Sequence, residues 1–358
     1  MRILIMAGGT GGHVYPGLAV AQSLRAQGVE VVWMGTRAGL EADVVTRAGI
    51  NISFISVSGL RGKGWLSWLL APTKLTVAFL QSLKLLMRLR PNAVLGMGGF
   101  VTGPGGFSAW LLDKPLIIHE QNAIAGLTNR LLAPLAKKAL EGFPGSLKTR
   151  HALPTGNPVR AEIVAIAAPA QRLSGRNGPL RLLVLGGSLG AQIFNEVVPK
   201  CLQNLDPAAR PEVWHQAGVR NIDAARQHYK SAGLEARLVP FISDMAEAYA
   251  WADLVLCRAG ALTVAELACA GVAAILVPYP HAVDDHQTHN ARYLADAGAA
   301  VLVPQPDLTA AYLTGLLQEF SQARHRLLDM AQAARARAQP EATARVAALC
   351  MEAANGQA

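Results

Sequence analysis

Two glycine-rich segments in distant parts of the chain have the residue types and spacing that bind phosphate. Residues 8–12 read Gly-Gly-Thr-Gly-Gly and residues 186–191 read Gly-Gly-Ser-Leu-Gly-Ala, and each follows a short aliphatic run. Glycine lets backbone N–H groups approach a phosphate closely, and the start of the following helix adds partial positive charge. One such segment is weak evidence, but two predict a pair of nucleotide-fold domains that face each other across a cleft.

The first half holds further candidates for ligand contact. His13 directly follows the first glycine segment, where a helix start would point it into the cleft; a structural histidine is the alternative. In a third glycine-rich segment, 96–106, seven of the eleven positions are Gly or Pro, which indicates close packing against a ligand. The polar run 119–122 follows an expected strand, at the edge where parallel sheets bind ligands, with surface exposure as the alternative.

The segment 257–266 is the corresponding candidate in the second half. Thr263 and Glu266 have the spacing of a capping box, in which each residue satisfies a free N–H group at the helix start. The alternative is that Glu266 accepts hydrogen bonds from ribose hydroxyls while the helix start faces a diphosphate. Because a helix dipole contributes only about half a charge, that alternative also requires Arg160 or Arg258.

A metal site is not expected. The run 281–290 contains three histidines and two aspartates, but they lie too close together in sequence to converge on one ion without a hairpin. No Asp-x-Asp pair occurs in the chain, which argues against a metal-chelated sugar nucleotide. We therefore predict chemistry with neither a metal ion nor another cofactor.

The composition is that of a globular protein, with 51% hydrophobic and 16% charged residues. The four cysteines form no Cys-x-x-Cys pair and no signal peptide is visible, so a reducing, cytoplasmic environment is expected. The net charge of +9 is uneven: residues 1–160 contain 17 Lys and Arg against 6 Asp and Glu, whereas residues 161–358 contain 16 against 18. This asymmetry predicts an anionic partner for the first half, with a plain solubility charge as the alternative.

Aliphatic runs alternate with helical stretches, which predicts parallel sheets covered by helices on both faces. The expected strands lie at 3–7, 29–34, 52–57, 93–97, 115–119, 181–185, 211–214, 236–239, 253–257, 273–277 and 299–303. The expected helices lie at 17–27, 40–48, 123–138, 190–204, 220–231, 263–270 and 286–297, followed by a helical tail from residue 309 that breaks near Pro340. The glycines within 91–112 predict a loop there. The segment 167–179, rich in Ala, Pro, Gly, Ser and Asn, has the composition of a linker. We place the domains at 1–161 and 162–340, with a C-terminal helix at 341–358.

The segment 61–90 has the pattern of a membrane-contacting surface. Trp65 and Trp68 lie among leucines and cations, and the helix expected from Thr73 to Arg90 is apolar apart from a narrow stripe. That stripe consists of Lys74, Gln81, Lys84 and Arg88. Tryptophan suits the lipid interface, and each cation near an anionic surface contributes about 1 kcal/mol. With the basic first half, the pattern favours contact with an anionic membrane surface over a buried domain helix.

A dinucleotide-dependent dehydrogenase is the obvious rival. That class requires glycines spaced as G-x-G-x-x-G and an acidic residue at the end of the second strand, for the ribose hydroxyls. Here the second aliphatic run ends in Gly35 and Thr36, and its only acid, Glu30, lies at the opposite end. The pattern therefore disfavours an NAD-dependent oxidoreductase.

Taken together, the motifs resemble those of the bacterial lipid II-forming N-acetylglucosaminyltransferase family over essentially the full length. The matching segments are GGTGGHVYPGLAVA at 8–21, SGLRGKG at 58–64, VLGMGGFVTGPGG at 94–106, HEQNAIAGLTN at 119–129, GNPVR at 156–160, GGSLGA at 186–191 and CRAGALTVAE at 257–266. The resemblance implies an α/β chain of GT-B fold. In that fold two Rossmann-like parallel-sheet domains face each other across a deep cleft, and the last helix returns to the first domain.

The resemblance implies an inverting transfer of N-acetylglucosamine (GlcNAc) from UDP-GlcNAc to the 4-hydroxyl of the N-acetylmuramoyl sugar (MurNAc) of lipid I, undecaprenyl-diphospho-MurNAc-pentapeptide. The products are lipid II, with a β-1,4 link, and UDP. It also implies a peripheral protein on the cytoplasmic face of the inner membrane that serves peptidoglycan synthesis and, through it, cell shape and division. Its partners would include other cell-wall synthesis proteins and no nucleic acid.

The resemblance also implies roles for individual residues. Ser188 would contact the donor diphosphate, the backbone around Ile242 the uracil, and Glu266 the ribose. The other implied UDP-GlcNAc contacts are Thr10, Gly11, Gly12, Asn122, Arg160, Ala261, Leu262, Thr263, Val264, Ala265 and Gln287. His13 is the candidate general base, with binding of the acceptor as its alternative role. The candidate acceptor-binding residues are Gly98, Gly99, Phe100, Thr102, Glu120 and Gln121.

One position departs from the family pattern. Where the second glycine segment commonly reads Gly-Gly-Ser-Gln-Gly-Ala, this chain has Leu189, so any polar contact of a glutamine there is absent. Two alternatives to the lipid I transferase stay open besides the oxidoreductase. One is a GT-B transferase with another lipid acceptor, such as diacylglycerol, and the other is a non-catalytic membrane scaffold. Oligomeric state, the peptide stem tolerated on the acceptor and the extent of domain closure are not determined by the sequence.

Overall fold

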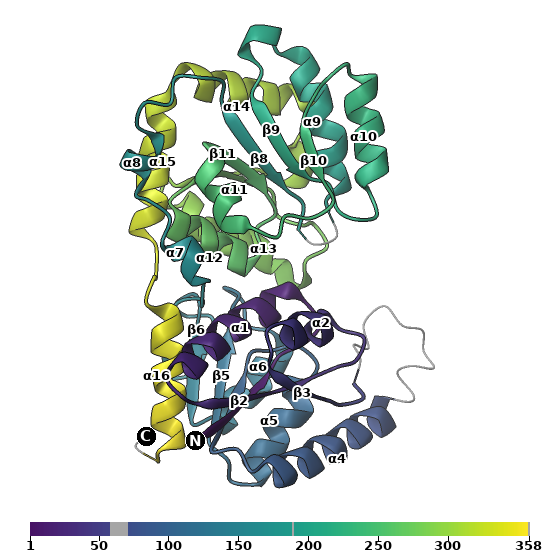
Figure 1. The fold of residues 1–358 in the computed structure, drawn as a ribbon, viewed down its shortest axis with the longest axis vertical. Coiled ribbons are helices and arrows are strands. Elements are labelled where there is room, and N and C mark those ends of the chain that lie inside the picture. Colours follow the sequence, from purple (N-terminus) through teal and green to yellow (C-terminus); the bar gives the residue numbers. More distant parts are fainter. Residues whose placement is uncertain (58–70, 188–189, 357–358) are drawn as a thin grey trace. The chain divides into compact units, whose positions relative to one another are not determined.

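The computed structural model describes residues 1–57, 71–187 and 190–356 and divides the chain into two compact units (Figure 1). Unit 1 comprises Met1–Arg160 and Pro340–Ala358, and unit 2 comprises Ala161–Gln339. The expected tryptophan-containing surface at 61–70, as well as Ser188 and Leu189, lie outside the described residues.

The described part of unit 1 contains a seven-stranded parallel sheet in the order β3-β2-β1-β4-β5-β6-β7 (Figure 1). Its strands are β1 (Arg2–Met6), β2 (Glu30–Gly35), β3 (Asn51–Phe54), β4 (Ala93–Gly96), β5 (Leu116–Glu120), β6 (Lys138–Glu141) and β7 (Ala152–Pro154). Its α-helices are α1 (Gly11–Ala26), α2 (Leu40–Arg47), α4 (Ala71–Leu89), α5 (Thr102–Leu111), α6 (Leu127–Leu132) and α16 (Ala342–Ala354).

Each face of this sheet has its own hydrophobic core, because successive side chains of a strand point to opposite faces. Ile3 and Ile5 pack on one face with residues of α1, α2 and α16. Leu4 and Met6 pack on the other face with residues of α4, α5 and α6. The C-terminal helix α16 thus completes the core of unit 1, where it lies against α1 (Figure 1).

The described part of unit 2 contains a six-stranded parallel sheet in the order β10-β9-β8-β11-β12-β13. Its strands are β8 (Arg181–Leu185), β9 (Glu212–Gln216), β10 (Arg237–Val239), β11 (Leu254–Cys257), β12 (Ala273–Leu276) and β13 (Ala300–Leu302). Its α-helices are α7 (Ala161–Val164), α8 (Pro169–Leu173), α9 (Gln192–Asn204), α10 (Ile222–Ser231), α11 (Met245–Trp251), α12 (Ala261–Ala270), α13 (His286–Ala295), α14 (Ala310–Gln322) and α15 (Arg324–Ala336). In both sheets the first strand lies centrally beside the fourth, which is the strand order of a Rossmann fold. The prediction of two Rossmann-like parallel-sheet domains is confirmed.

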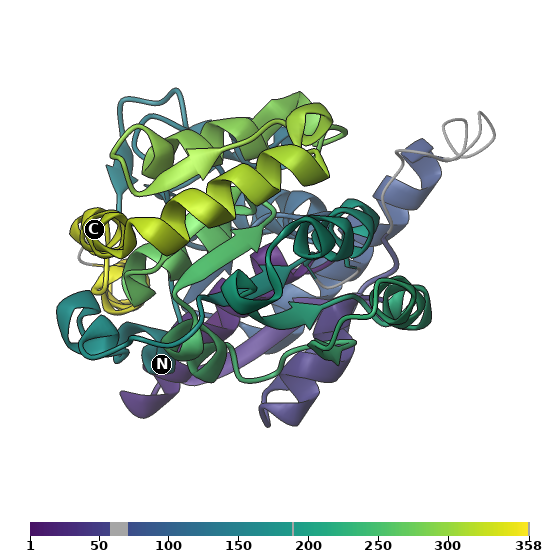
Figure 2. The ribbon, with the colours of Figure 1, turned by 90° about the horizontal axis from the view of Figure 1, so that it is seen from above.

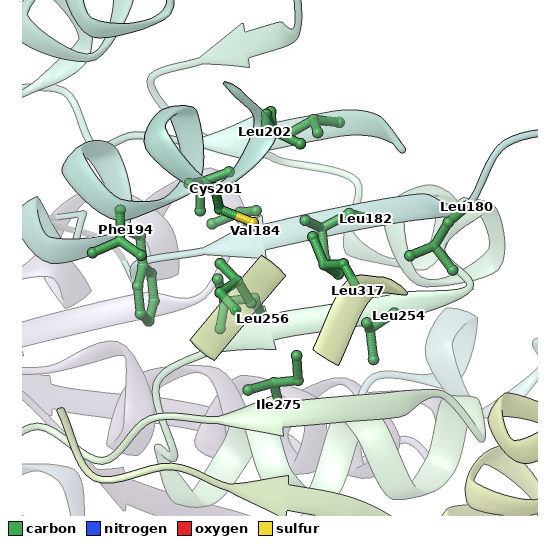
Figure 3. Packing of buried hydrophobic residues seen from close by; sticks show 14 of the residues in the cluster. Leu180, Leu182, Val184, Phe194, Cys201, Leu202, Leu254, Leu256, Ile275 and Leu317 are labelled. Atoms are coloured by element: carbon green, nitrogen blue, oxygen red, sulfur yellow. The ribbon is translucent and has the colours of Figure 1, made fainter. Parts of the chain in front are cut away.

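The core of unit 2 is densest where α9 and α14 cover the sheet. Leu182 and Leu254 of the central strands pack with Phe194 of α9 and Leu317 of α14 (Figure 3). Figure 2 shows α14 lying across the strands of this sheet. The carboxyl ends of these strands are thereby fixed, and the loops that follow them start from rigid positions.

Some stretches differ from the expectations. Residues 91–112, expected as a loop, contain α5, because Pro104 falls in its first turn, where a missing N–H costs no hydrogen bond. A Cβ atom at Gly105 would overlap Met6 Sδ, so the glycines of this segment let the helix lie directly on the sheet. The helix expected at 123–138 is largely replaced by the short α6 and a 3₁₀ turn, and Lys138 already begins β6. The segment 167–179 is tied to unit 2, since Arg172 donates to the carbonyls of Ala252 and Gly271.

Candidate active site

Two glycine-rich loops of unit 1 meet at the carboxyl ends of β1 and β4. Gly98 and Gly99 have φ angles of 97° and 80°, a backbone region that favours glycine. A Cβ atom at Gly99 would overlap the carbonyl oxygen of Gly8. The two loops are therefore in backbone contact, and only glycine permits it.

His13 lies in the first turn of α1, next to both loops. Its Nδ1 atom is 3.1 Å from Oγ1 of Thr10, the residue that precedes the helix. A Cβ atom at Gly98 would lie 2.9 Å from Cδ2 and 3.0 Å from Nε2 of His13. The structure thus brings together Thr10, His13, Gly98 and Gly99, which are far apart in sequence. In the tautomer whose Nδ1–H donates to Thr10 Oγ1, Nε2 is the unprotonated nitrogen of the imidazole.

Several other residues expected at the acceptor are buried and hydrogen-bonded within unit 1. Thr102 is fully buried; its hydroxyl accepts from Gly98 N at 3.1 Å and lies 2.8 Å from Gly98 O and 3.1 Å from Met6 O. Phe100, in contrast, is 50% exposed beside the first glycine loop. Of these two side chains, the structure leaves that of Phe100 open to a ligand, whereas that of Thr102 shapes the loop.

The carboxylate of Glu120 organises the loop that follows β5. It is buried and accepts hydrogen bonds from Asn122 N at 2.9 Å, Gly126 N at 3.0 Å and Asn129 Nδ2 at 2.9 Å. Asn122 remains partly exposed at the tip of this arrangement. Because the carboxylate is committed to three donors of its own loop, Glu120 fixes the position of Asn122.

A buried network connects the same loop to the residues before Arg160. Gln121 Nε2 lies 3.0 Å from His119 Nδ1, and His119 Nε2 lies 3.0 Å from Gly156 O. Burial lowers the pKa of His119 to about 4, so the imidazole is neutral and its Nε2–H donates to Gly156. Asn157 in turn donates to Gln121 O at 2.9 Å. His119 and Gln121 are thus structural, and they hold the start of the segment that ends in Arg160.

Glu41 is a positioning residue that the sequence did not single out. It is fully buried and accepts hydrogen bonds from Gly9 N at 3.1 Å, Thr36 N at 2.8 Å and Thr36 Oγ1 at 2.7 Å. Its carboxylate therefore fastens the first glycine loop to the end of β2.

In unit 2, the capping box expected at Thr263 and Glu266 is absent. Helix α12 begins at Ala261, with Gly260 as the preceding residue and no side-chain cap. The backbone N–H groups at the helix start are therefore left for another acceptor, such as phosphate oxygen. Glu266 lies further along the helix, is 6% exposed, and accepts a hydrogen bond from Tyr249 Oη at 3.0 Å.

The two candidate arginines have different surroundings. Arg258 donates to Val277 O, Pro278 O and Gln305 Oε1, and its guanidinium lies 5.4 Å from the ring centre of Tyr279. It therefore holds the loop after β12, where Gln287 Oε1 accepts from Tyr279 N at 2.9 Å. Arg160 belongs to unit 1, where its guanidinium lies 5.6 Å from the ring centre of Tyr15 on α1.

Among the described residues, no group of three or more His, Cys, Asp or Glu side chains could hold a metal ion. The run 281–290 lies within the described part and forms no such group. At the carboxyl edges of the two sheets the described residues place glycine turns and helix starts, whose backbone N–H groups are of the kind that bind phosphate, and in unit 1 the imidazole of His13.

The chain matches two family profiles, one for each unit. The glycosyltransferase family 28 N-terminal domain matches residues 3–141, and the glycosyltransferase family 28 C-terminal domain matches residues 181–346. The protein of Marinobacter nauticus named UDP-N-acetylglucosamine–N-acetylmuramyl-(pentapeptide) pyrophosphoryl-undecaprenol N-acetylglucosamine transferase is 56% identical over 99% of this chain and 98% of its own length. The protein of the same name from Nitrosococcus oceani is 57% identical over 99% of both chains.

Solved structures agree with this assignment. The crystal structure of Acinetobacter baumannii MurG is 41% identical, covers 98% of this chain and 99% of its own, and superposes with a TM-score of 0.83. A UDP-GlcNAc 2-epimerase from Neisseria meningitidis, 11% identical, has a TM-score of 0.69 over 98% of this chain and 100% of its own, which shows a shared fold alone. The chain therefore belongs to glycosyltransferase family 28, within the family of UDP-N-acetylglucosamine–N-acetylmuramyl-(pentapeptide) pyrophosphoryl-undecaprenol N-acetylglucosamine transferases.

Proposed function

We propose that this protein transfers GlcNAc from UDP-GlcNAc to the 4-hydroxyl of MurNAc in lipid I, with inversion at the anomeric carbon, to give lipid II and UDP. The observation that carries this proposal is the identity of 56–57% to transferases named for that donor and acceptor, over 99% of the chain. A match of that length includes both units, so it covers the donor half and the acceptor half of the reaction together. The product serves peptidoglycan synthesis and, through it, cell shape and division.

Unit 2 is proposed to bind the donor. The uncapped start of α12 supplies the N–H groups of Ala261, Leu262 and Thr263 and partial positive charge to the diphosphate, and Val264 and Ala265 follow in the same turn. Ser188, outside the described residues, is expected to contact the same diphosphate. Glu266 is buried except for 6% of its surface, and its carboxylate accepts from the ribose hydroxyls in addition to Tyr249. The backbone at Ile242 contacts the uracil, and Gln287 completes the donor contacts of this unit.

Unit 1 is proposed to bind the acceptor and to supply the base. The glycine turns at 9–12 and 98–99 bind the acceptor diphosphate through backbone N–H groups other than those of Gly9 and Gly98, which donate to Glu41 and Thr102. These turns lie in the half of the chain that carries the excess of cations. His13 removes the proton of the attacking hydroxyl through Nε2, while Thr10 holds Nδ1. Thr102, Glu120 and Gln121 contribute by positioning these loops, since the hydroxyl of Thr102, the carboxylate of Glu120 and Nε2 of Gln121 bond within the protein.

Charge on the departing UDP must be stabilised as the glycosidic bond breaks. Helix starts and arginines can do this with fixed dipoles and charges that need no reorganisation at the moment of transfer. Arg160, at the end of the segment fixed by the His119 network, is proposed to complete the donor contacts, with Thr10 to Gly12 and Asn122.

We further propose that unit 1 contacts an anionic membrane surface through α4, α5 and α6. Large apolar side chains of these three helices are exposed: Leu75, Val77, Leu80, Met87, Phe107, Trp110, Leu111, Leu127 and Leu131. Helices α4 and α5 pack together, as do α5 and α6, so these side chains belong to one region. Lys74, Lys84, Arg88 and Arg130 are exposed on the same helices. Exposed apolar side chains with cations on the same helices are typical of surfaces that bind membranes rich in anionic lipid.

This surface would hold the protein at the cytoplasmic face of the inner membrane, where an undecaprenyl-linked acceptor is anchored. None of the helices that the structure describes is long and apolar enough to cross a bilayer. Attachment through one side of unit 1 is the mode of association that the exposed residues support, and contact with other cell-wall synthesis proteins would add to it.

The test is a choice of acceptor. The purified protein is incubated with radiolabelled UDP-GlcNAc and equal amounts of a short-chain lipid I analogue and diacylglycerol, and the lipid products are separated. Label in the lipid I product alone is expected. Label in the diacylglycerol product would favour the other lipid glycosyltransferase, and no transfer with intact UDP-GlcNAc binding would reopen the acceptor assignment. A melting temperature raised by UDP but not by NAD separates both transferases from the oxidoreductase.

A further inference from the structure

The side-chain amide of Gln216 connects two loops at the carboxyl edge of the sheet in unit 2. Gln216 is the last residue of β9, and only 4% of it is exposed. Its Nε2 donates to Gly187 O at 2.7 Å, and its Oε1 accepts from Ile242 N at 3.0 Å. The first of these residues follows β8 and the second follows β10, so one amide joins segments that are distant in sequence.

The orientation of this amide is fixed by its partners. Gly187 offers a carbonyl oxygen, which can only accept, and Ile242 offers an N–H group, which can only donate. Rotating the amide by half a turn would set acceptor against acceptor and donor against donor. A glutamine serves both partners at once, whereas a glutamate of the same shape has no donor when it is ionised.

The Gly187 carbonyl is held entirely from inside the protein. It accepts from Gln216 and also from Gly190 N at 3.0 Å. Gly190 has a φ of 77°, and a Cβ atom there would overlap the carbonyl oxygen of Ala217. Gly190 therefore lies directly on the backbone that follows Gln216. With its oxygen directed toward the amide, Gly187 does not present that partial negative charge to an incoming phosphate.

We propose that Gln216 is a positioning residue for donor binding. Its two hydrogen bonds hold the backbone at Gly187, after β8, and the uracil-binding backbone at Ile242, after β10, at one fixed separation. A nucleoside diphosphate contacts both segments at once. Its affinity is therefore higher when the two segments already have the correct separation in the unliganded protein. This inference rests on the proposed function of unit 2 as the donor-binding half.

The variant Gln216→Glu tests the two hydrogen bonds of Gln216 separately, because it keeps one and removes the other. At about pH 8 the carboxylate still accepts from Ile242 N but confronts Gly187 O with a second acceptor. By isothermal titration calorimetry we expect UDP affinity to fall about tenfold to a hundredfold, with uridine affinity changed less than about threefold. Uridine lacks the phosphates, so it reports on the uracil contact at Ile242 and the ribose contact at Glu266, without the contacts to the diphosphate.

Lowering the pH should rescue this variant. Once the introduced carboxyl group is protonated, its O–H can donate to Gly187 O, as the amide does in the natural protein. We therefore expect the ratio of wild-type to variant UDP affinity to approach one between about pH 8 and about pH 5.5. Because both proteins bind the same ligand, this ratio of affinities cancels the effect of the titration of UDP itself. His215, the neighbouring residue on β9, stays neutral throughout, because burial lowers its pKa to about 3.

Two further variants make the result decisive. Gln216→Met keeps the length of the side chain but removes both hydrogen bonds, so UDP and uridine should both bind more weakly, at every pH. Gln318→Glu makes the same charge change at an exposed position on α14 and should bind both ligands as the wild type does.

Each outcome decides a different question. If Gln216→Glu binds UDP as tightly as the wild type, Gln216 does not position the donor site and the inference is wrong. The inference is also wrong if that variant loses UDP binding, uridine binding and melting temperature together without recovery at low pH, since that is a folding defect. If the wild-type protein itself binds no UDP, the proposed function fails and the role of Gln216 falls with it.

Discussion

The imidazole of His13 rests against the backbone of Gly98. A Cβ atom at residue 98 would lie 2.9 Å from Cδ2 and 3.0 Å from Nε2 of His13, closer than ordinary contacts between such atoms. The residue that carries the proposed base and the glycine loop proposed for the acceptor are thus in direct contact. Any side chain at position 98 must displace the imidazole.

Gly98→Ala is therefore expected to lower kcat about tenfold to a hundredfold, because a small displacement of a catalytic group costs that much. UDP affinity should stay within about twofold of the wild type, since unit 2 is untouched. Gly103→Ala is the matched control: it lies in the same segment, its φ is not positive, and its new Cβ would meet Thr128 Cγ2 at an ordinary 3.7 Å. Equal activity of the two variants would mean that the contact with Gly98 does not set the position of His13.

Glu266→Ala is expected to weaken UDP and UDP-GlcNAc binding about tenfold to a hundredfold, because it removes charge-assisted hydrogen bonds to the ribose hydroxyls. The control is Tyr249→Phe, which removes the hydroxyl that donates to Glu266 but leaves the carboxylate in place. That variant should keep most of the affinity. Isothermal titration calorimetry gives both constants, and unchanged affinity of Glu266→Ala would show that Glu266 does not contribute to donor binding.

Acid should destabilise the protein through its buried histidines. Burial lowers the pKa of His119 to about 4 from 6.5, so between these values the unfolded chain binds a proton that the folded protein does not. This contribution to stability is complete above pH 6.5 and is lost as the pH falls toward 4, on the order of 3 kcal/mol in total. His119→Gln retains an N–H donor and removes the titration. Urea unfolding midpoints should therefore depend less on pH in that variant, and an equal dependence would contradict the assignment.

Removing apolar surface from α4 should release the protein from anionic membranes. Leu80 is 55% exposed on that helix, and Leu80→Asp both removes apolar contact and adds repulsion from the lipid head groups. We expect sedimentation with phosphatidylglycerol vesicles to fall about tenfold or more. Tyr312→Asp, at an exposed position of α14 in unit 2, makes a comparable change and should sediment like the wild type. Equal losses in both variants would show that the effect is not specific to α4.

The alternation of strands and helices could be predicted because each element has its own local pattern of hydrophobic residues. The central strands of both sheets are uninterrupted aliphatic runs, and glycine turns mark where they end. β6 could not be found in this way, since its four residues, Lys138–Glu141, directly follow an alanine- and leucine-rich stretch that resembles a helix. Helix α5 was not predicted, because a segment so rich in glycine has the composition of a loop. The structure shows why the glycines are there: the helix packs so closely that side chains at these positions would overlap their neighbours.

The glycine turns and His13 were also predictable, because the chemistry of each depends on its own short segment. Glu41 and Gln216 were not, because their roles exist only through partners distant in sequence. Glu41 holds Gly9, and Gln216 holds Ile242, and neither acid nor amide carries a local signal of that function. Of the two alternatives for Thr263 and Glu266, the capping box was wrong, since the helix starts three residues earlier than such a box requires.

The division of labour between the two units is tested most directly by measuring turnover and donor affinity together on His13→Ala. With a short-chain lipid I analogue as acceptor, kcat should fall about 10²- to 10⁴-fold, the usual contribution of a general base, while the dissociation constant of UDP-GlcNAc changes less than about twofold. Loss of both to the same degree would contradict the assignment, because it would make His13 part of the donor site instead of the group that activates the acceptor.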